Sequence, residues 1–220
     1  MIEQKRLPSD SPALGLEQGL WQSGKTYVAG VDEAGRGALA GPVIAGVVIL
    51  PNVPGLKRAL QGVRDSKQMT SRQRAIWAEK IKEIALAWAV GAASAEEIDA
   101  LGILPATRLA VTRAIQELSL QPDFLLMDYL PWPGLQIPHR MMPKGETQSL
   151  SIACASVLAK TSRDTLMQQL DFEYPGYGLA QHKGYGTQRH RAALCALGYS
   201  PIHRRTFSFQ EQARQITLFE

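Results

Sequence analysis

The sequence has few cysteines and no long hydrophobic run. Its two cysteines, Cys154 and Cys195, lie far apart in apolar stretches without zinc-ligand spacing, so we expect buried free thiols rather than a disulfide or a zinc site. The longest apolar run, residues 43–50, is too short for a membrane helix, which needs about 20 residues. Residues 1–25 mix charged residues, serine and proline without an apolar core, which predicts no secretory signal and a cytoplasmic protein.

Acidic residues are missing from one end of the chain. Residues 182–210 contain no Asp or Glu, but they hold three of the four histidines and a group of basic residues: Lys183, Arg189, Arg191, Arg204 and Arg205. A net charge of +4 is mild, so this uneven distribution is what favours a polyanionic partner. The 220 residues, 45% of them apolar, predict a globular protein with one main core.

Strand patterns and helix patterns alternate along the chain. Apolar and β-branched residues predict strands over residues 25–32, 43–50, 88–93, 123–128 and 135–141. Apolar residues at three- and four-residue spacing predict a helix that begins at residue 70 or 71, and others over 104–118, 149–171 and 187–197, while Ser94 caps a short acidic turn. The order predicts an α/β fold with a mixed sheet, in which the first two strands are antiparallel and helical crossovers reach the later ones.

Carboxylates stand at the ends of two predicted strands. Asp32 and Glu33 end the first, and Asp128 ends the strand at residues 123–128. Because an unpaired buried charge is costly, these acids need a cation, either Arg36 or Lys67 in an ion pair or a divalent metal. Neighbouring residues on a strand face opposite sides of the sheet, so we expect Glu33 to leave the pleat if it shares a metal with Asp32.

An acidic cluster completed by Glu146 would suit one or two Mg²⁺ or Mn²⁺ ions, which can activate water against a phosphodiester. The alternative is that these acids form structural ion pairs only. The glycines beside Arg36 leave backbone amides open to a phosphate, which favours a nuclease.

These residues belong to a series of motifs with a known order. Residues 28–37 (VAGVDEAGRG) are followed by LAGPV at 39–43, Asp65-Ser66-Lys67, residues 151–160 with Arg163-Asp164, residues 182–187 (HKGYGT) and residues 203–207. In this order they resemble the bacterial ribonuclease HII family, the type 2 ribonucleases H. The similarity covers residues 25–209.

The resemblance implies a ribonuclease H-like mixed β-sheet flanked by helices, with a small helical C-terminal appendage. It also implies an endonuclease that cleaves RNA in RNA–DNA hybrids, including on the 5′ side of a single ribonucleotide in duplex DNA. Water activated by Mn²⁺ or Mg²⁺ would leave 5′-phosphate and 3′-hydroxyl ends, and the reaction would serve ribonucleotide removal and DNA repair.

The resemblance also implies a set of site residues. The metal and catalytic residues would be Asp32, Glu33 and Asp128, with Glu146 as a fourth acid where the family usually has aspartate. The substrate-binding residues would be Gly35, Arg36, Gly37, Lys67, Lys183, Tyr185 and Arg204. The Gly35-Arg36-Gly37 loop would face the ribose 2′-hydroxyl, Tyr185 would stack on the next sugar, and the basic residues would contact phosphates.

The chain is expected to comprise an N-terminal extension (1–24), a catalytic domain (25–180), a basic helical part of the same unit (181–209) and a tail (210–220). In the tail, Gln215, Leu218 and Phe219 resemble the short peptide by which bacterial proteins bind the DNA sliding clamp, although the tail could instead pack on its own domain. We expect a monomer with no membrane partner.

Two other functions remain open from the sequence. One is another nuclease of the same fold, such as a junction resolvase or an integrase, against which the Gly35-Arg36-Gly37 and Tyr185 motifs argue. The other is a non-enzymatic module that binds RNA–DNA hybrids and uses its acids as structural ion pairs.

Overall fold

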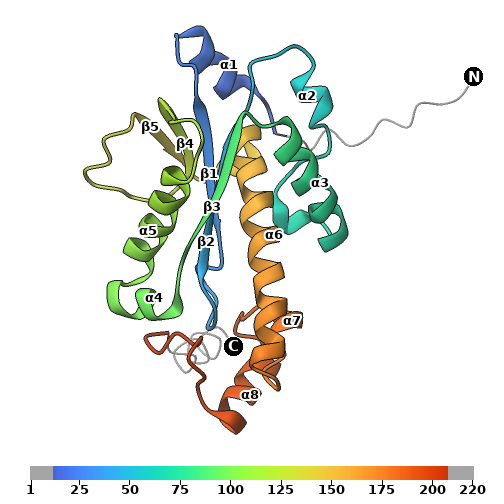
Figure 1. Cartoon of the computed structure of the whole chain (residues 1–220), viewed down its shortest axis with the longest axis vertical. Coiled ribbons are helices and arrows are strands. Elements are labelled where there is room, and N and C mark those ends of the chain that lie inside the picture. Colours follow the sequence, from blue (N-terminus) through green and yellow to red (C-terminus); the bar gives the residue numbers. More distant parts are fainter. Residues whose placement is uncertain (1–11, 208–220) are drawn as a thin grey trace, which may run out of the picture. The chain divides into compact units, whose positions relative to one another are not determined.

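Five strands form one mixed sheet in the order β3-β2-β1-β4-β5 (Figure 1). The computed structural model describes residues 12–207, and the strands are β1 (Val28–Ala34), β2 (Val43–Ile49), β3 (Ala87–Ala93), β4 (Phe124–Asp128) and β5 (His139–Met142). β4 pairs in parallel with both β1 and β5. All five predicted strands are therefore present, with ends that differ by a few residues.

Burial explains the sequence pattern of the strands. Every residue of β2 is buried, which accounts for its unbroken run of apolar residues and glycine. By contrast β3, at the edge of the sheet, buries only every second residue, because alternate side chains point to opposite faces. The continuous apolar run at residues 43–50 is thus the signature of a strand in the interior of the sheet.

The chain divides into two compact units. One consists of Met1–Asp32, Val47–Trp88 and Leu118–Val157, and the other of Glu33–Gly46, Ala89–Glu117 and Leu158–Glu220. The domain boundaries expected from the sequence stay a prediction.

The first unit holds all the described helices that precede β3 and two elements that follow β5. They are α1 (Gly15–Gln22), α2 (Leu56–Ala59) and α3 (Ser71–Ile84), with the 3₁₀ turns η1 (Ser66–Gln68) and η2 (Gly145–Thr147) and the beginning of α6 (Leu150–Glu173). Thr70 caps α3 as predicted, because its side chain accepts from the Gln73 N–H while the Gln73 side chain accepts from the Thr70 N–H. The helix α1 lies within residues 1–24, which are expected to form an N-terminal extension.

A buried carboxylate from α1 anchors the beginning of α6. Glu17 is fully buried, and its Oε1 accepts hydrogen bonds from the Ser151 N–H (2.9 Å) and from the hydroxyls of Ser149 (2.6 Å) and Ser151 (2.7 Å). A negative charge at this position also complements the helix dipole. Gly30 of β1 packs on the same turn, where a Cβ would lie 2.1 Å from the Ser151 carbonyl carbon. This close approach fixes β1 just before Asp32.

The second unit contains the remaining helices: α4 (Ala95–Leu101), α5 (Ile103–Gln116), α7 (Leu179–His182), α8 (Gln188–Leu197) and the later part of α6. α4 and α5 pack on one another (Figure 1), and Ser94 caps α4 through a capping box with Glu97. The core of this unit joins residues that follow β1 to residues of the C-terminal helices: Leu39, Ala40, Met167, Tyr177, Leu179 and Leu194.

The two cysteines differ in their exposure. Cys154 is buried in α6, and burial raises the pKa of its thiol. Cys195 is exposed, so the expectation of two buried thiols is wrong for this residue. The reason is that α8 buries His190 and Leu194 and turns the following residue to solvent.

Between residues 12 and 207, no helix combines the length and the apolar character needed to span a membrane.

Candidate functional site

Two carboxylates occupy equivalent positions on neighbouring parallel strands. In the β1–β4 ladder Val31 pairs with Met127, so Asp32 and Asp128 each stand one residue beyond the last pair. Paired residues of a parallel ladder project on the same face, and neighbouring strands lie about 4.8 Å apart. Asp32 is 8% exposed and Asp128 is half-buried. The pairing therefore sets two acidic side chains next to one another where the β1–β4 ladder ends.

A third acid lies in the turn that packs on Asp128. The Gly145 N–H donates to Asp128 Oδ1 (3.3 Å), and a Cβ on Gly145 would meet Ile152 Cδ1 at 2.7 Å. Gly145 therefore packs closely on α6 and is followed by Glu146 in η2. The Glu146 side chain is 7% exposed, and its Oε2 has no hydrogen-bond partner among residues 12–207. A buried carboxylate oxygen without a partner is costly unless a cation or a proton satisfies it.

Lys67 carries the positive charge that faces these acids. It lies in η1, where Asp65 accepts from its backbone N–H (2.9 Å), and Ser66 beside it bonds the Ser156 hydroxyl (2.8 Å). Burial acts to lower the pKa of Lys67, but the surrounding carboxylates outweigh it and raise the pKa: Asp65, Asp32, Glu146 and Asp128. Lys67 is thus an ammonium close to three of the four predicted metal ligands.

Glu33 is placed differently from the expectation. β1 continues through it to Ala34, so Glu33 does not leave the pleat. Its carboxylate forms an ion pair with Arg36 (3.1 Å), and its side chain is 12% exposed. The strand has no need to bend, because the charge of Glu33 is met three residues later. This contact belongs to the second unit.

The side chains at this site are of a kind that binds a divalent cation, but they are not arranged as a complete set of metal ligands. Among the described residues, no three Asp, Glu, His or Cys side chains are close enough together to hold a metal ion as placed. Carboxylate oxygens are nevertheless the ligands that Mg²⁺ and Mn²⁺ prefer. Asp32, Asp128 and Glu146 supply such oxygens around Lys67, and one of them, Glu146 Oε2, has no hydrogen-bond partner within residues 12–207.

Two buried arginines hold the loop that follows β1. Arg204 is fully buried and donates to Gly35 O (2.7 Å), Arg36 O (2.8 Å) and Gly41 O (2.8 and 3.0 Å). Arg163 is also fully buried and donates to three further carbonyl oxygens, those of Ala40, Pro42 and Lys183 (2.8–3.0 Å).

The Gly35-Arg36-Gly37 loop can take this shape only because of its first glycine. Gly35 has φ +96°, and a Cβ there would lie 2.0 Å from Arg163 Nε. The Arg36 side chain is 35% exposed and Gly37 is exposed, so the outer part of the loop is open to solvent while its carbonyls are fixed from behind.

This geometry changes the role of Arg204. The sequence predicts a contact with substrate phosphate, but the guanidinium is buried and four of its five N–H groups point at carbonyl oxygens. Arg204 instead positions the loop. Nothing in the sequence indicates this role for Arg163. Its partners are backbone carbonyl oxygens, which every residue has, so the bonds do not depend on which residues stand at those positions.

Tyr185 lies beside the same loop. Its backbone forms a bridge to Ala38, and its half-buried ring has Arg163 Cζ at 5.4 Å and Lys160 Nζ at 5.5 Å from the centroid. Lys183, two residues earlier, has φ +53° and donates from Nζ to Ala180 O. The loop and the tyrosine, 150 residues apart in sequence, therefore form one surface in the second unit.

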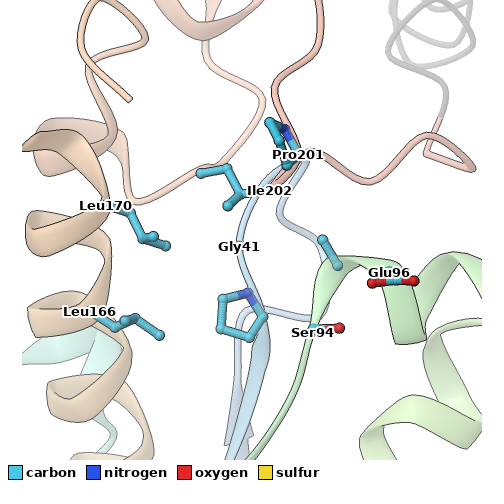
Figure 2. Close-up of a pocket in the computed structure, with 9 residues that line it drawn as sticks. Gly41, Ser94, Glu96, Leu166, Leu170, Pro201 and Ile202 are labelled. Carbon is cyan, nitrogen blue, oxygen red and sulfur yellow. The ribbon is translucent and has the colours of Figure 1, made fainter. Parts of the chain in front are cut away.

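The second unit also has an apolar pocket of about 280 Å³ (Figure 2). Leu166, Leu170, Pro201 and Ile202 line it, with Ser94 and Glu96 from the beginning of α4. None of the predicted site residues between 12 and 207 lines this pocket.

The mixed sheet and the two acids where the β1–β4 ladder ends are those of a nuclease of the ribonuclease H class. In agreement, the crystal structure of ribonuclease H2 from Pyrococcus horikoshii OT3 matches with a TM-score of 0.71 and 26% sequence identity over 89% of this chain and 100% of that chain. A family model described as Ribonuclease HII matches residues 29–210, so the chain belongs to the ribonuclease HII family.

Individual relatives agree with this assignment. The Ribonuclease HII of Dehalococcoides mccartyi strain BAV1 is 50% identical over 198 residues, which are 90% of this chain and 92% of the relative. That of a Thermus thermophilus strain is 51% identical over 90% of this chain and 94% of the relative. The resemblance seen in the sequence is confirmed, and the chain is a ribonuclease H enzyme, whose class cleaves RNA in RNA–DNA hybrids.

Proposed function

We propose that this enzyme also cuts on the 5′ side of a single ribonucleotide embedded in duplex DNA, leaves 5′-phosphate and 3′-hydroxyl ends, and so serves ribonucleotide removal. The observation that carries the proposal is the placement of Asp32 and Asp128 at equivalent positions of two paired parallel strands, with the Glu146 turn bonded to Asp128.

Asp32, Asp128 and Glu146, together with Glu33 next along the chain from Asp32, would hold Mg²⁺ or Mn²⁺. When bound, the cation supplies an activated water and stabilises charge on the phosphodiester oxygens. The chain's own contribution is to hold several carboxylates close together, with the Lys67 ammonium beside them.

The Gly35-Arg36-Gly37 loop and Tyr185 would recognise the ribonucleotide. Only the 2′-hydroxyl distinguishes RNA from DNA at one nucleotide, and rigid backbone groups read a hydroxyl well because they do not rearrange. Arg163 and Arg204 give the loop that rigidity. The Tyr185 ring would stack on the following sugar and disfavour a second 2′-hydroxyl there, while Arg36, Lys67 and Lys183 would contact phosphates.

A defined set of duplexes tests the proposal. The enzyme is offered a DNA duplex with one ribonucleotide, an all-DNA duplex, an RNA–DNA hybrid and a four-way junction, with Mg²⁺, Mn²⁺ or neither, and the product ends are mapped on a sequencing gel. We expect metal-dependent cleavage of the hybrid and of the single-ribonucleotide duplex only. Absence of a cut at the ribonucleotide would refute the proposal, and cleavage of the junction would favour a resolvase.

Two variants separate catalysis from binding. Asp32→Asn should lose at least about 100-fold in kcat, because it weakens a metal ligand, and should still bind the hybrid. Glu79→Gln, an exposed acid of α3 paired with Lys82, is the matched control and should keep wild-type activity. If Asp32→Asn cleaved like the control, the acids would be structural ion pairs.

The predicted clamp-binding residues Gln215, Leu218 and Phe219 lie outside the described residues. We keep the sliding clamp as a proposed partner, and deletion of residues 214–220 should abolish its binding without changing hybrid cleavage. Unchanged clamp binding would refute the proposal.

A further inference from the structure

Three histidines of the acid-free segment form a cluster in the second unit, with His182 half-buried. The rings of His182 and His190 stack at 4.4 Å with an interplanar angle of 16°, and His190 Nε2 lies 3.1 Å from His203 Nε2. His190 is fully buried and His203 is 2% exposed. None of the three has a part in the proposed chemistry, yet every one of their ring nitrogens has a hydrogen-bond partner.

The hydrogen bonds assign one tautomer to each ring. At one end, His203 Nδ1 must accept, because its partners are the Ser200 N–H (3.1 Å) and the Ser200 hydroxyl (2.8 Å), and so its proton is on Nε2. At the other end, His190 Nδ1 faces Tyr185 O (3.1 Å), which only accepts, and so carries the proton.

The two assignments agree where the rings meet, since His203 Nε2–H donates to the lone pair of His190 Nε2. By the same reasoning, His182 Nε2 donates to Tyr177 O (2.8 Å) and His182 Nδ1 accepts from the Gly184 N–H (3.2 Å). A further proton on His190 would set two N–H groups against each other.

The cluster forms hydrogen bonds to the backbone of a strained turn at residues 183–185. Lys183 has φ +53°, a conformation that is strained for a residue with a side chain and that persists only where its surroundings enforce it. His182 holds the N–H of Gly184 and His190 holds the carbonyl of Tyr185. On the other side, Gly184 O accepts from the Leu39 N–H (2.8 Å).

We propose that His182, His190 and His203 are positioning residues for Tyr185, a relay of neutral imidazoles in fixed tautomers that holds the turn carrying its ring. The proposal rests on the proposed function, in which Tyr185 contacts the sugar after the ribonucleotide. The histidines touch no substrate, and they act through the Gly184 and Tyr185 backbone.

The surroundings keep the relay neutral. Burial, the largest cause, lowers the pKa of all three histidines, and each is lowered further by neighbouring cations or imidazoles. The charged and titratable groups that face the cluster are Arg189, Asp171 and Lys183 at His182 and Arg205, Tyr177 and Tyr199 at His203.

Nitrogen NMR of the wild-type enzyme tests the tautomers without any activity. At pH 7 we expect protons on His182 Nε2, His190 Nδ1 and His203 Nε2 and on no other ring nitrogen of these residues. An imidazolium among the three, or the opposite tautomer at His190, would overturn the relay.

Substrate discrimination tests the positioning. The measured quantity is the ratio of kcat/KM for a duplex in which DNA follows the ribonucleotide to that for one in which RNA follows it. His190→Leu removes the bond to Tyr185 O and should lower this ratio at least about fivefold, because small displacements of a contacting group are costly. His190→Asn keeps an N–H donor at the position of Nδ1, facing Tyr185 O, and should restore this ratio to within about twofold of the wild-type value. His139→Asn, in β5, is the matched control.

The outcomes distinguish the two levels of the argument. If the wild type cleaved both duplexes equally, the proposed role of Tyr185 would fail. If Tyr185→Ala lost discrimination while His190→Leu kept it, or if His190→Leu lowered both activities in proportion, only the positioning would fail. Should His190→Leu not fold, His182→Leu, which releases the Gly184 N–H, is measured in its place and carries the same expectation.

Discussion

Replacing Arg204 by lysine separates the two roles that this residue can have. The guanidinium makes four hydrogen bonds to three carbonyl oxygens, those of Gly35, Arg36 and Gly41. A lysine ammonium is a single point and can reach at most two of these oxygens, so at least two charge-assisted bonds are lost. At about 1.5 kcal/mol each, the free energy of unfolding should fall by about 3 kcal/mol.

The assay is urea unfolding at pH 7 together with the salt dependence of hybrid binding. Arg205→Lys is the matched control, because this neighbour is exposed and its change should stay within about 0.5 kcal/mol. Cleavage at a single ribonucleotide by Arg204→Lys should fall about tenfold or more as the loop shifts, while the salt slope of binding stays constant. A slope reduced by about 1 with unchanged stability would refute the positioning and restore Arg204 as a phosphate contact.

Three further predictions concern the fold around the site. Burial and the neighbouring His190 lower the pKa of His203 to about 4 from its usual 6.5, so the unfolded state binds more protons between these two values. The free energy of unfolding should therefore be unaffected by this group above pH 6.5 and should fall as the pH drops towards 4. In urea unfolding, His203→Gln should make that fall less steep. An equally steep fall in the variant would contradict the assignment. Gly30→Ala would place a methyl 2.1 Å from the Ser151 backbone, so its melting temperature should drop by at least about 10 °C, and a drop under about 2 °C would show that β1 and α6 are not in close contact. Iodoacetamide should modify Cys195 in the folded enzyme and reach Cys154 only after unfolding, as peptide mass spectrometry will show; early modification of Cys154 would contradict its burial.

The elements of the fold follow from local sequence signals, whereas most of the site's contacts do not. A few neighbouring residues are enough to predict the helix caps at Thr70 and Ser94 and the buried strand β2. The position of Asp128 at the end of its strand could be predicted for the same reason, whereas β1 continues two residues past Asp32.

The contacts that could not be predicted are those whose partners cannot be recognised from the sequence. Arg204 binds backbone carbonyls, which every residue has, so a solvated phosphate contact is the natural interpretation of a basic segment. Glu33 is met by Arg36, and nothing in the spacing decides between that pair and a metal. The anchor formed by Glu17 depends on residues more than 130 positions away.

The bonds from Arg204 to the loop after β1 join residues that are synthesised at different times. The loop at residues 35–41 leaves the ribosome before its anchor, which lies 163 to 169 residues later in the sequence. Contacts of such sequence separation form late in folding, because a long segment must be closed first. The part of the enzyme proposed to recognise a ribonucleotide therefore takes its final form only after Arg204 has been synthesised and has reached it.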